Sequence, residues 1–205
     1  MLAKLICFMN KSIRVGLFNW ASFPLQNGFY PADLPAEWKL SFYANEFESA
    51  CINLCEIVAA DQFFEWFEDL PEEFQLSFMI DPSQLNMLTE LVNQGGLKIH
   101  YLLVAPSEPD ILSQNSANKT LLSGATICDS ERVVSLSTIW TPDNDSQSSA
   151  IALLPDSNDL RLYRQWIELW VENSSQQKLT LWLDGRTARY STLSELRTLV
   201  ELMGY

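Results

Sequence analysis

The sequence predicts an α/β protein, a shortened (β/α) barrel of the TIM type whose helices are reduced in the middle third. Apolar segments typical of strands alternate with segments of helical periodicity, and connections of this length imply parallel strands with right-handed crossovers. Up to eight strands can be counted in 205 residues, a length near the lower limit for this barrel. An open doubly wound sheet is the alternative fold, although no G-x-G-x-x-G motif follows any strand.

The individual elements follow from hydrophobic periodicity and from start and stop signals. Asp81 before Pro82 is a strong helix start, and Thr192 with Glu195 forms a T-x-x-E capping box before the last helix. The expected strands are residues 13–19, 49–55, 74–80, 97–104, 125–128, 133–138, 150–154 and 178–184. The expected helices are residues 36–47, 61–70, 82–93 and 158–172, and the helix that begins at the capping box.

The composition indicates one globular domain, residues 13–205, preceded by an N-terminal extension, residues 1–12. The chain is 47% apolar with seven tryptophans, and its net charge is −13. An acidic chain without a basic stripe is a poor nucleic-acid binder. Residues 40–97 hold eleven acidic residues and no lysine or arginine. This run is either a solvated face or a docking surface for a basic protein partner.

The apolar start, MLAKLICFM, is too short to span a membrane and has no small-residue cleavage site. We therefore expect a cytoplasmic protein without a membrane segment. The start is a disordered leader or an extra strand, and LICFM is a candidate cover for an open barrel edge. An uncovered edge would favour a homodimer.

The four cysteines are expected to be reduced, because nothing indicates secretion. Cys51 and Cys55 lie in the run SACINLC, which reads as a strand, where residues four apart are separated by about 13 Å. That distance excludes a disulfide and a shared metal ion, so we expect buried structural thiols.

Residues 13–80 resemble the YecE-like family, known as domain of unknown function 72. The resemblance rests on IRVGLFNW, GFYPADLPAEWKLSFYANEF, FESACINL and FFEWFEDLPEEFQLSFMI, in that order, and on KLTLWLDG near the end. It implies a TIM-type barrel but supplies no reaction. It also implies that the aromatic stretch at residues 16–35, which has no charged residue before Asp33, is a lid packed on the barrel. The scaffold positions kept are Gly16, Trp20, Phe29, Tyr30, Pro31, Leu34, Trp38, Phe47, Ile52 and Asn53.

The family's polar positions are not kept. Its E-I-N glutamate aligns with Cys51, its T-F-Y-R segment with residues 55–58, its strand-end lysine with Met79, and its F-N-N asparagines with Asp184 and Gly185. A barrel would use such groups at strand ends for acid–base chemistry or anion binding. Their joint replacement indicates either a lost activity or a rebuilt site.

Function in a barrel sits where strands end and loops begin. The predicted strand ends carry Asn19, Trp20, Glu56, Asp81, Asp129, Asp156 and Asp184. Converging carboxylates would bind a divalent cation or pair as general acid and base, but carboxylates after strands are also ordinary helix caps. The candidate ligand-binding residues are Asn19, Trp20, Asn53, Glu56, Asp184 and Arg186. No catalytic residue, metal ion or cofactor is assigned.

The single histidine, His100, is placed inside a strand, where a hydrogen-bonded structural role is expected rather than catalysis. Arg186 and Arg189 follow the last strand and would bind a phosphate or carboxylate ligand, or pair with surface acids. Two functions remain open. One is a degenerate YecE-like barrel that binds a protein or a small polar ligand; the other is an enzyme with a remodelled carboxylate site, a metal-assisted hydrolase or lyase.

Overall fold

The computed structural model describes residues 11–23, 28–56, 66, 69–84, 86–90, 99–104, 133–135, 138–144 and 148–205. The chain divides into two compact units: unit 1 comprises residues 1–29 and 138–205, and unit 2 comprises residues 30–137. The strands within each unit pair in parallel. The predicted parallel α/β class is therefore confirmed, and it is compatible with part of a (β/α) barrel.

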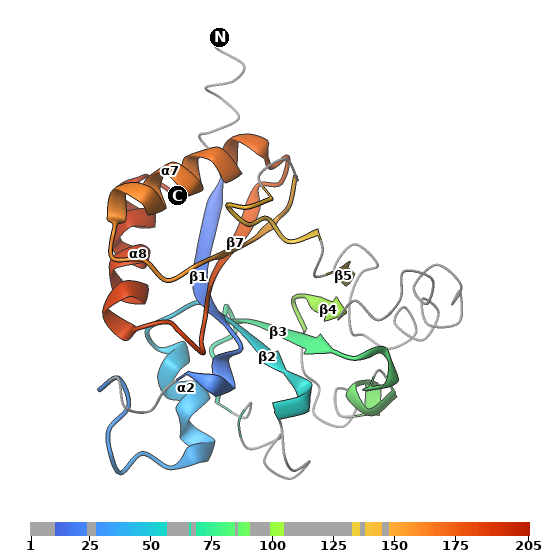
Figure 1. The fold of residues 1–205 in the computed structure, drawn as a ribbon. Coiled ribbons are helices and arrows are strands. Elements are labelled where there is room, and N and C mark those ends of the chain that lie inside the picture. Colours follow the sequence, from blue (N-terminus) through green and yellow to red (C-terminus); the bar gives the residue numbers. More distant parts are fainter. Residues whose placement is uncertain are drawn as a thin grey trace. The chain divides into compact units, whose positions relative to one another are not determined.

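The sheet of unit 1 joins the two ends of the described chain. Strand β1 (Ser12–Phe18) pairs along its whole length with β7 (Lys178–Asp184), and β7 pairs with β6 (Ile151–Leu154). Trp140 adds a further parallel bridge to Ala152 on the outer side of β6. Figure 1 shows β1 in blue beside β7 in red-orange, although the sequence separates them widely.

Two amphipathic helices complete unit 1. Helix α7 (Leu160–Asn173) begins at Asp159, whose Oδ1 accepts hydrogen bonds from the backbone N–H groups of Arg161 and Leu162. Helix α8 (Tyr190–Leu202) packs against α7 and β1. The helices lie on one side of the β1–β7 pair (Figure 1). Their buried side chains, at helical spacing, are Tyr163, Ile167, Trp170, Val171, Leu193, Leu196 and Val200.

The predicted capping box is wrong. Helix α8 begins at Tyr190, with Arg189 in extended backbone geometry at the N-cap and no side-chain cap. Thr192 is therefore inside the first turn, and it is buried. The cause is the turn after β7, where Thr187 and Ala188 both donate backbone hydrogen bonds to the Asp184 carbonyl and so allow an earlier helix start.

The described part of the chain starts at Lys11, which lies within the residues predicted to be an N-terminal extension. Lys11 is 8% exposed, and its Nζ donates to the carbonyl oxygens of Val171 and Ser174, both at 2.6 Å. Those oxygens lie at the C-terminal end of α7, where an ammonium group is favourable. Residues 1–10 lie outside the described part of the chain.

Unit 2 contains four parallel strands in the order β2 (Ser49–Asn53), β3 (Gln75–Ile80), β4 (Leu102–Val104) and β5 (Val133–Ser135). A single 3-10 turn, η3 (Ala36–Trp38), leads into the short helix α2 (Lys39–Ala44). The Tyr43 hydroxyl donates to the Ser49 carbonyl at 3.0 Å and thereby ties α2 to the start of β2.

Two predicted strands of unit 2 have different bounds in the structure. Strand β2 stops at Asn53. The Asn53 side-chain Oδ1 accepts a hydrogen bond from the Cys55 backbone N–H at 3.1 Å, and this bond turns the chain into η4 (Leu54–Glu56). Cys55 is consequently an exposed thiol, contrary to the prediction that both cysteines are buried, whereas Cys51 is buried. Strand β4 is only three residues long, so His100 precedes it.

Other predicted elements are only partly described. Residues 86–90 are helical, as expected, while strand 125–128 and most of helix 61–70 lie outside the described residues. In the described part of the chain, no helix has the length and apolarity needed to cross a membrane.

Candidate functional site

The carboxyl ends of the parallel strands in unit 1 meet at one edge, as the direction of their pairing requires. Asn19 follows β1, Asp156 lies just after β6, and Asp184 ends β7. A pocket of about 510 Å³ opens beside the last two strands. It is lined by Thr141, Pro142, Asp143, Leu153, Leu154, Pro155, Asp156, Asp184 and Thr187. We refer to it as the edge pocket.

Asn19 and Asp184 are joined directly. The Asn19 Nδ2 donates to Oδ1 of Asp184 at 3.2 Å, and Asn19 has a left-handed backbone with φ 55°. Asparagine tolerates this conformation better than most residues. The two backbones also approach closely here. The Gly185 N–H donates to the Phe18 carbonyl at 2.6 Å, and a Cβ added at Gly185 would lie 2.5 Å from the backbone carbonyl oxygen of Asn19. Glycine is thus required where β1 and β7 end.

Arg186 covers the other side of the Asp184 carboxylate. Its Nε lies 3.0 and 3.1 Å from the two carboxylate oxygens, and its Nη2 lies 2.5 Å from Oδ2. Burial by itself raises the pKa of Asp184, but the hydrogen bonds from Arg186 and Asn19 and the nearby positive charge outweigh it and leave the pKa lowered. Asp184 is therefore a fixed anion at neutral pH and a hydrogen-bond acceptor rather than a general acid.

A second carboxylate, Asp156, lines the same pocket. Its Oδ2 accepts from Arg189 Nε at 3.2 Å, and Arg189 also donates to the Asn158 side-chain oxygen. The Oδ1 atom of Asp156 is buried and has no hydrogen-bond partner within the described residues. The expectation that Arg186 and Arg189 pair with acids is thus confirmed for both.

The segment that carries Asp156 is held by Tyr163 of α7. The Tyr163 hydroxyl donates to the Pro155 carbonyl at 3.1 Å and accepts from the Ser157 N–H at 2.7 Å. Burial, as the largest cause, raises the pKa of this phenol to about 12, so it stays protonated and keeps donating. The pocket wall is therefore fixed to the helix behind it.

The five aromatic side chains in residues 16–35 are buried: Phe18, Trp20, Phe23, Phe29 and Tyr30. Trp20, in η1 (Trp20–Ser22), is only 4% exposed, which places this candidate ligand-binding residue in the interior. Phe29 contacts Phe23 at 6.1 Å and Tyr190 of α8 at 4.9 Å between ring centroids. The predicted lid role extends to residues 24–27, which lie outside the described part.

The candidates of unit 2 have local structural roles. Asn53 forms the turn after β2. Asp81 accepts hydrogen bonds from the Ser83 hydroxyl at 2.6 Å and from the Ser83 backbone N–H at 2.9 Å, and these bonds lower the pKa of Asp81. Asp81 is therefore the cap that Asp-Pro predicted. Glu56 ends η4, and its side chain, like the whole of Asp129, lies outside the described part.

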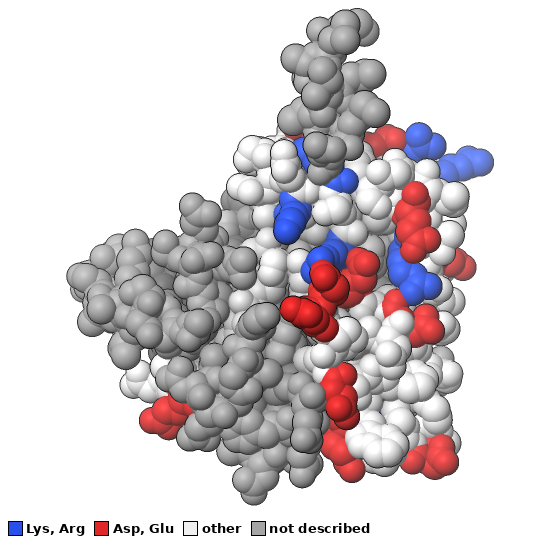
Figure 2. Space-filling model, turned by 180° about the vertical axis from the view of Figure 1, so that it is seen from behind, with Lys and Arg blue, Asp and Glu red and all other residues white. Residues whose placement is uncertain are grey.

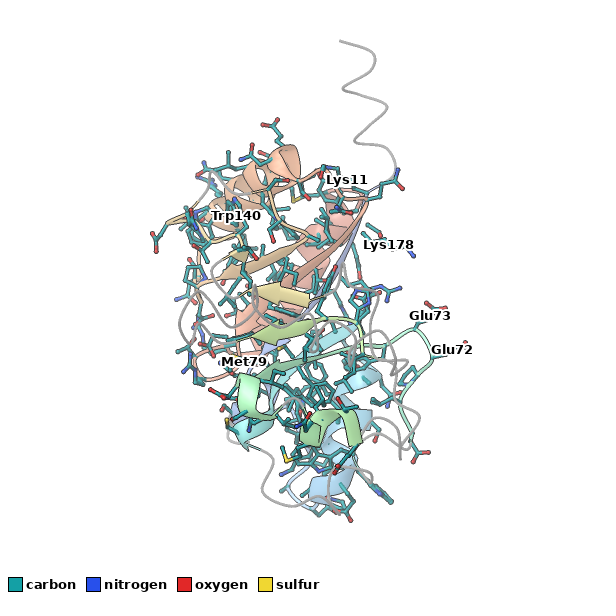
Figure 3. All side chains as sticks on the ribbon, turned by 90° about the vertical axis from the view of Figure 1, so that its right-hand side faces the viewer. Lys11, Glu72, Glu73, Met79, Trp140 and Lys178 are labelled. Atoms are coloured by element: carbon teal, nitrogen blue, oxygen red, sulfur yellow. The ribbon has the colours of Figure 1, made fainter. Side chains whose placement is uncertain are left out.

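His100 and Met79 have structural surroundings. The His100 N–H donates to the Leu76 carbonyl at 2.6 Å, and the ring packs edge-on against Tyr101 at 4.4 Å. Met79 of β3, labelled in Figure 3, stands where the family resemblance places a lysine. Across the described ranges, no three histidine, cysteine, aspartate or glutamate side chains are grouped to hold a metal ion.

Three polar lining residues were missed from sequence: Thr141, Asp143 and Thr187. The polar segment after residue 140 was interpreted as a plain loop because the preceding strand was expected to end at residue 138. Trp140, labelled in Figure 3, instead bridges to β6, with its N–H bonded to the Ile151 carbonyl at 3.0 Å. Extending the apolar run through Ile139 and Trp140 would have placed Thr141 at a strand end.

Comparison with known proteins adds no relative: no protein-family model and no curated protein sequence matches this chain.

Proposed function

We propose that this chain is a divergent YecE-like barrel protein that binds a small polar ligand in the edge pocket and performs no chemistry there. The proposal rests chiefly on one observation. The edge pocket lies at the carboxyl ends of parallel strands, which is where (β/α) proteins bind ligands. The sequence resemblance supports the barrel fold. The replacement of the family's polar positions supports the loss of an older activity.

The lining of the pocket defines the ligand's chemistry. Carboxylates of Asp156 and Asp184 accept hydrogen bonds only, and their arginine partners hold them in place. The apolar part of the wall consists of Leu153, Leu154 and two prolines. A ligand that presents hydroxyl or ammonium donors on a small apolar body matches both surfaces.

The second candidate function is an enzyme with a remodelled carboxylate site. The observation in its favour is that Asp156 and Asp184 line one pocket. The Asp184 carboxylate argues against this second candidate. Its pKa is lowered and it accepts hydrogen bonds from Arg186 and Asn19, so it is poorly suited to proton transfer. The cytoplasmic location and the homodimer remain predictions.

The test is a binding screen monitored by ¹H–¹⁵N NMR, with separate pools of polyols and sugars, primary amines, carboxylates and phosphates. We expect saturable shifts from one donor-rich pool at the amides of residues 141–143, 156–157 and 184–187. Thr141→Val and Asp156→Asn should weaken binding, while the exposed α8 variant Glu195→Gln should not. Turnover of a bound compound that Asp184→Asn abolishes would favour the enzyme instead.

A further inference from the structure

The aromatic side chain most exposed in the described part of the protein is Trp38, at the end of η3. It is 59% exposed, whereas the other described tryptophans are buried or half-buried. Trp38 lines a groove of about 360 Å³ in unit 2, together with Leu34, Ser41, Phe42, Asn45 and Asp69. An exposed tryptophan in a concave site is a frequent anchor of protein interfaces.

The groove is preformed rather than loose. The backbone N–H of Trp38 donates to the Pro35 carbonyl at 3.2 Å, and the Ser41 hydroxyl donates to the backbone carbonyl of Trp38 at 3.1 Å. Behind the groove, the Phe42 ring contacts Tyr30 at 5.9 Å, and Tyr30 is 8% exposed. Binding would therefore cost little ordering of the backbone.

The charge around the groove selects the partner. Among the described residues of unit 2, ten are acidic and Lys39 is the one basic residue. Asp69 lies in the groove itself, and Glu72 and Glu73 extend outward from the turn before β3 in Figure 3. On the face shown in Figure 2, the lysine and arginine atoms gather in the upper part, and the lower part of the described surface shows acidic atoms and no basic ones.

We propose that this groove docks a basic segment of a protein partner, with an arginine or lysine side chain lying on the Trp38 ring and pairing with Asp69. A cation over a tryptophan face is attracted by the ring's quadrupole, and the aliphatic stem of the basic residue covers Leu34 and Phe42. The surrounding acids steer the segment toward the groove and make binding dependent on salt. This site lies in unit 2 and does not depend on the function proposed for the edge pocket.

The experiment uses the full chain and a labelled synthetic peptide in which arginine alternates with leucine and glycine. Affinity is measured by fluorescence anisotropy at several salt concentrations, and the Trp38 indole N–H is followed by NMR. We expect Trp38→Ala to weaken binding about tenfold or more. Asp69→Asn should weaken it less and reduce the salt dependence. A peptide with glutamine in place of arginine should also bind about tenfold more weakly.

Two control variants separate the groove from general attraction. Leu202→Ala removes another exposed apolar side chain and Glu195→Gln another exposed carboxylate, both in unit 1, and neither should change the affinity. The Trp38 side chain is exposed, so we expect Trp38→Ala to keep the fold, and circular dichroism checks this. Equal binding by wild type and Trp38→Ala overturns the proposal. So does an equally strong, saturable shift of the Trp38 indole with tetramethylammonium alone, which would identify a small-cation site.

Discussion

The Asn19 side chain donates a 3.2 Å hydrogen bond to Asp184 across 165 positions of sequence. It thereby connects the residue after the first described strand to the last residue of β7. The same two strand ends approach through Gly185 and Phe18. The wall of the edge pocket is thus positioned by contacts among strand ends.

Replacing Asn19 separates its hydrogen bond from its backbone conformation. Asn19→Ala loses the bond and puts alanine at φ 55°, so it should lower the free energy of unfolding by about 2 kcal/mol. Asn19→Gly loses only the bond and should cost about half as much. Urea denaturation measures both values. Equal losses in the two variants would show that the left-handed backbone is not a constraint here.

Gly185 should tolerate no side chain. In Gly185→Ala, the Cβ would meet the Asn19 carbonyl oxygen at 2.5 Å, so we expect a loss of about 2–3 kcal/mol or a shifted strand end. Gly28→Ala is the matched control, because a Cβ there has nothing within 4 Å. Its only expected cost is the strain of alanine at a φ of 68°. Calorimetry of both variants checks the difference. A Gly185→Ala protein as stable as Gly28→Ala contradicts the close approach.

Asp184 should make stability depend on acid pH. Its folded-state pKa is lowered, so the ionised form stabilises the protein above the unfolded pKa, about 3.9, and this stabilisation is lost as pH falls through the folded pKa. Urea midpoints between about pH 2 and 6 should therefore fall less steeply with acid in Asp184→Asn than in wild type. Its cost at neutral pH should be about 1 kcal/mol, because the Arg186 partner is largely exposed. Identical pH profiles would refute the assignment.

Lys11 should matter although it lies at the edge of the described chain. Lys11→Met leaves the Val171 and Ser174 carbonyls without the ammonium, so we expect unfolding to become easier by about 2 kcal/mol. Lys178→Met, at an exposed position paired with Ser12, is the control and should be nearly neutral. Thermal unfolding of both proteins measures the contrast. Figure 3 labels both lysines.

Much of unit 1 was predictable because its elements are long and strongly periodic. The Tyr163–Trp170 stripe and the apolar run of β7 identify helix and strand without tertiary information. The ends were less predictable. Whether a Thr-x-x-Glu pattern caps α8, or lies inside it, depends on how the preceding turn bonds to the Asp184 carbonyl.

The site was predictable only in part. Asn19, Asp184 and Arg186 were identified from strand ends, and the structure brings these three together. Thr141 and Asp143 were missed, because a single bridge at Trp140 leaves almost no sequence pattern. The cap role of Asp81 was readable locally, since Asp-Pro at a helix start needs no long-range contact.

The most direct test of the central claim is an NMR titration of the full chain with members of the donor-rich pools, in wild type, Thr141→Val and Glu195→Gln. We expect saturable shifts confined to residues 141–143, 156–157 and 184–187. The affinity should be weakened about tenfold in Thr141→Val and unchanged in Glu195→Gln. The absence of binding from every pool, or saturable binding that Thr141→Val leaves unchanged and that shifts other residues, would contradict it.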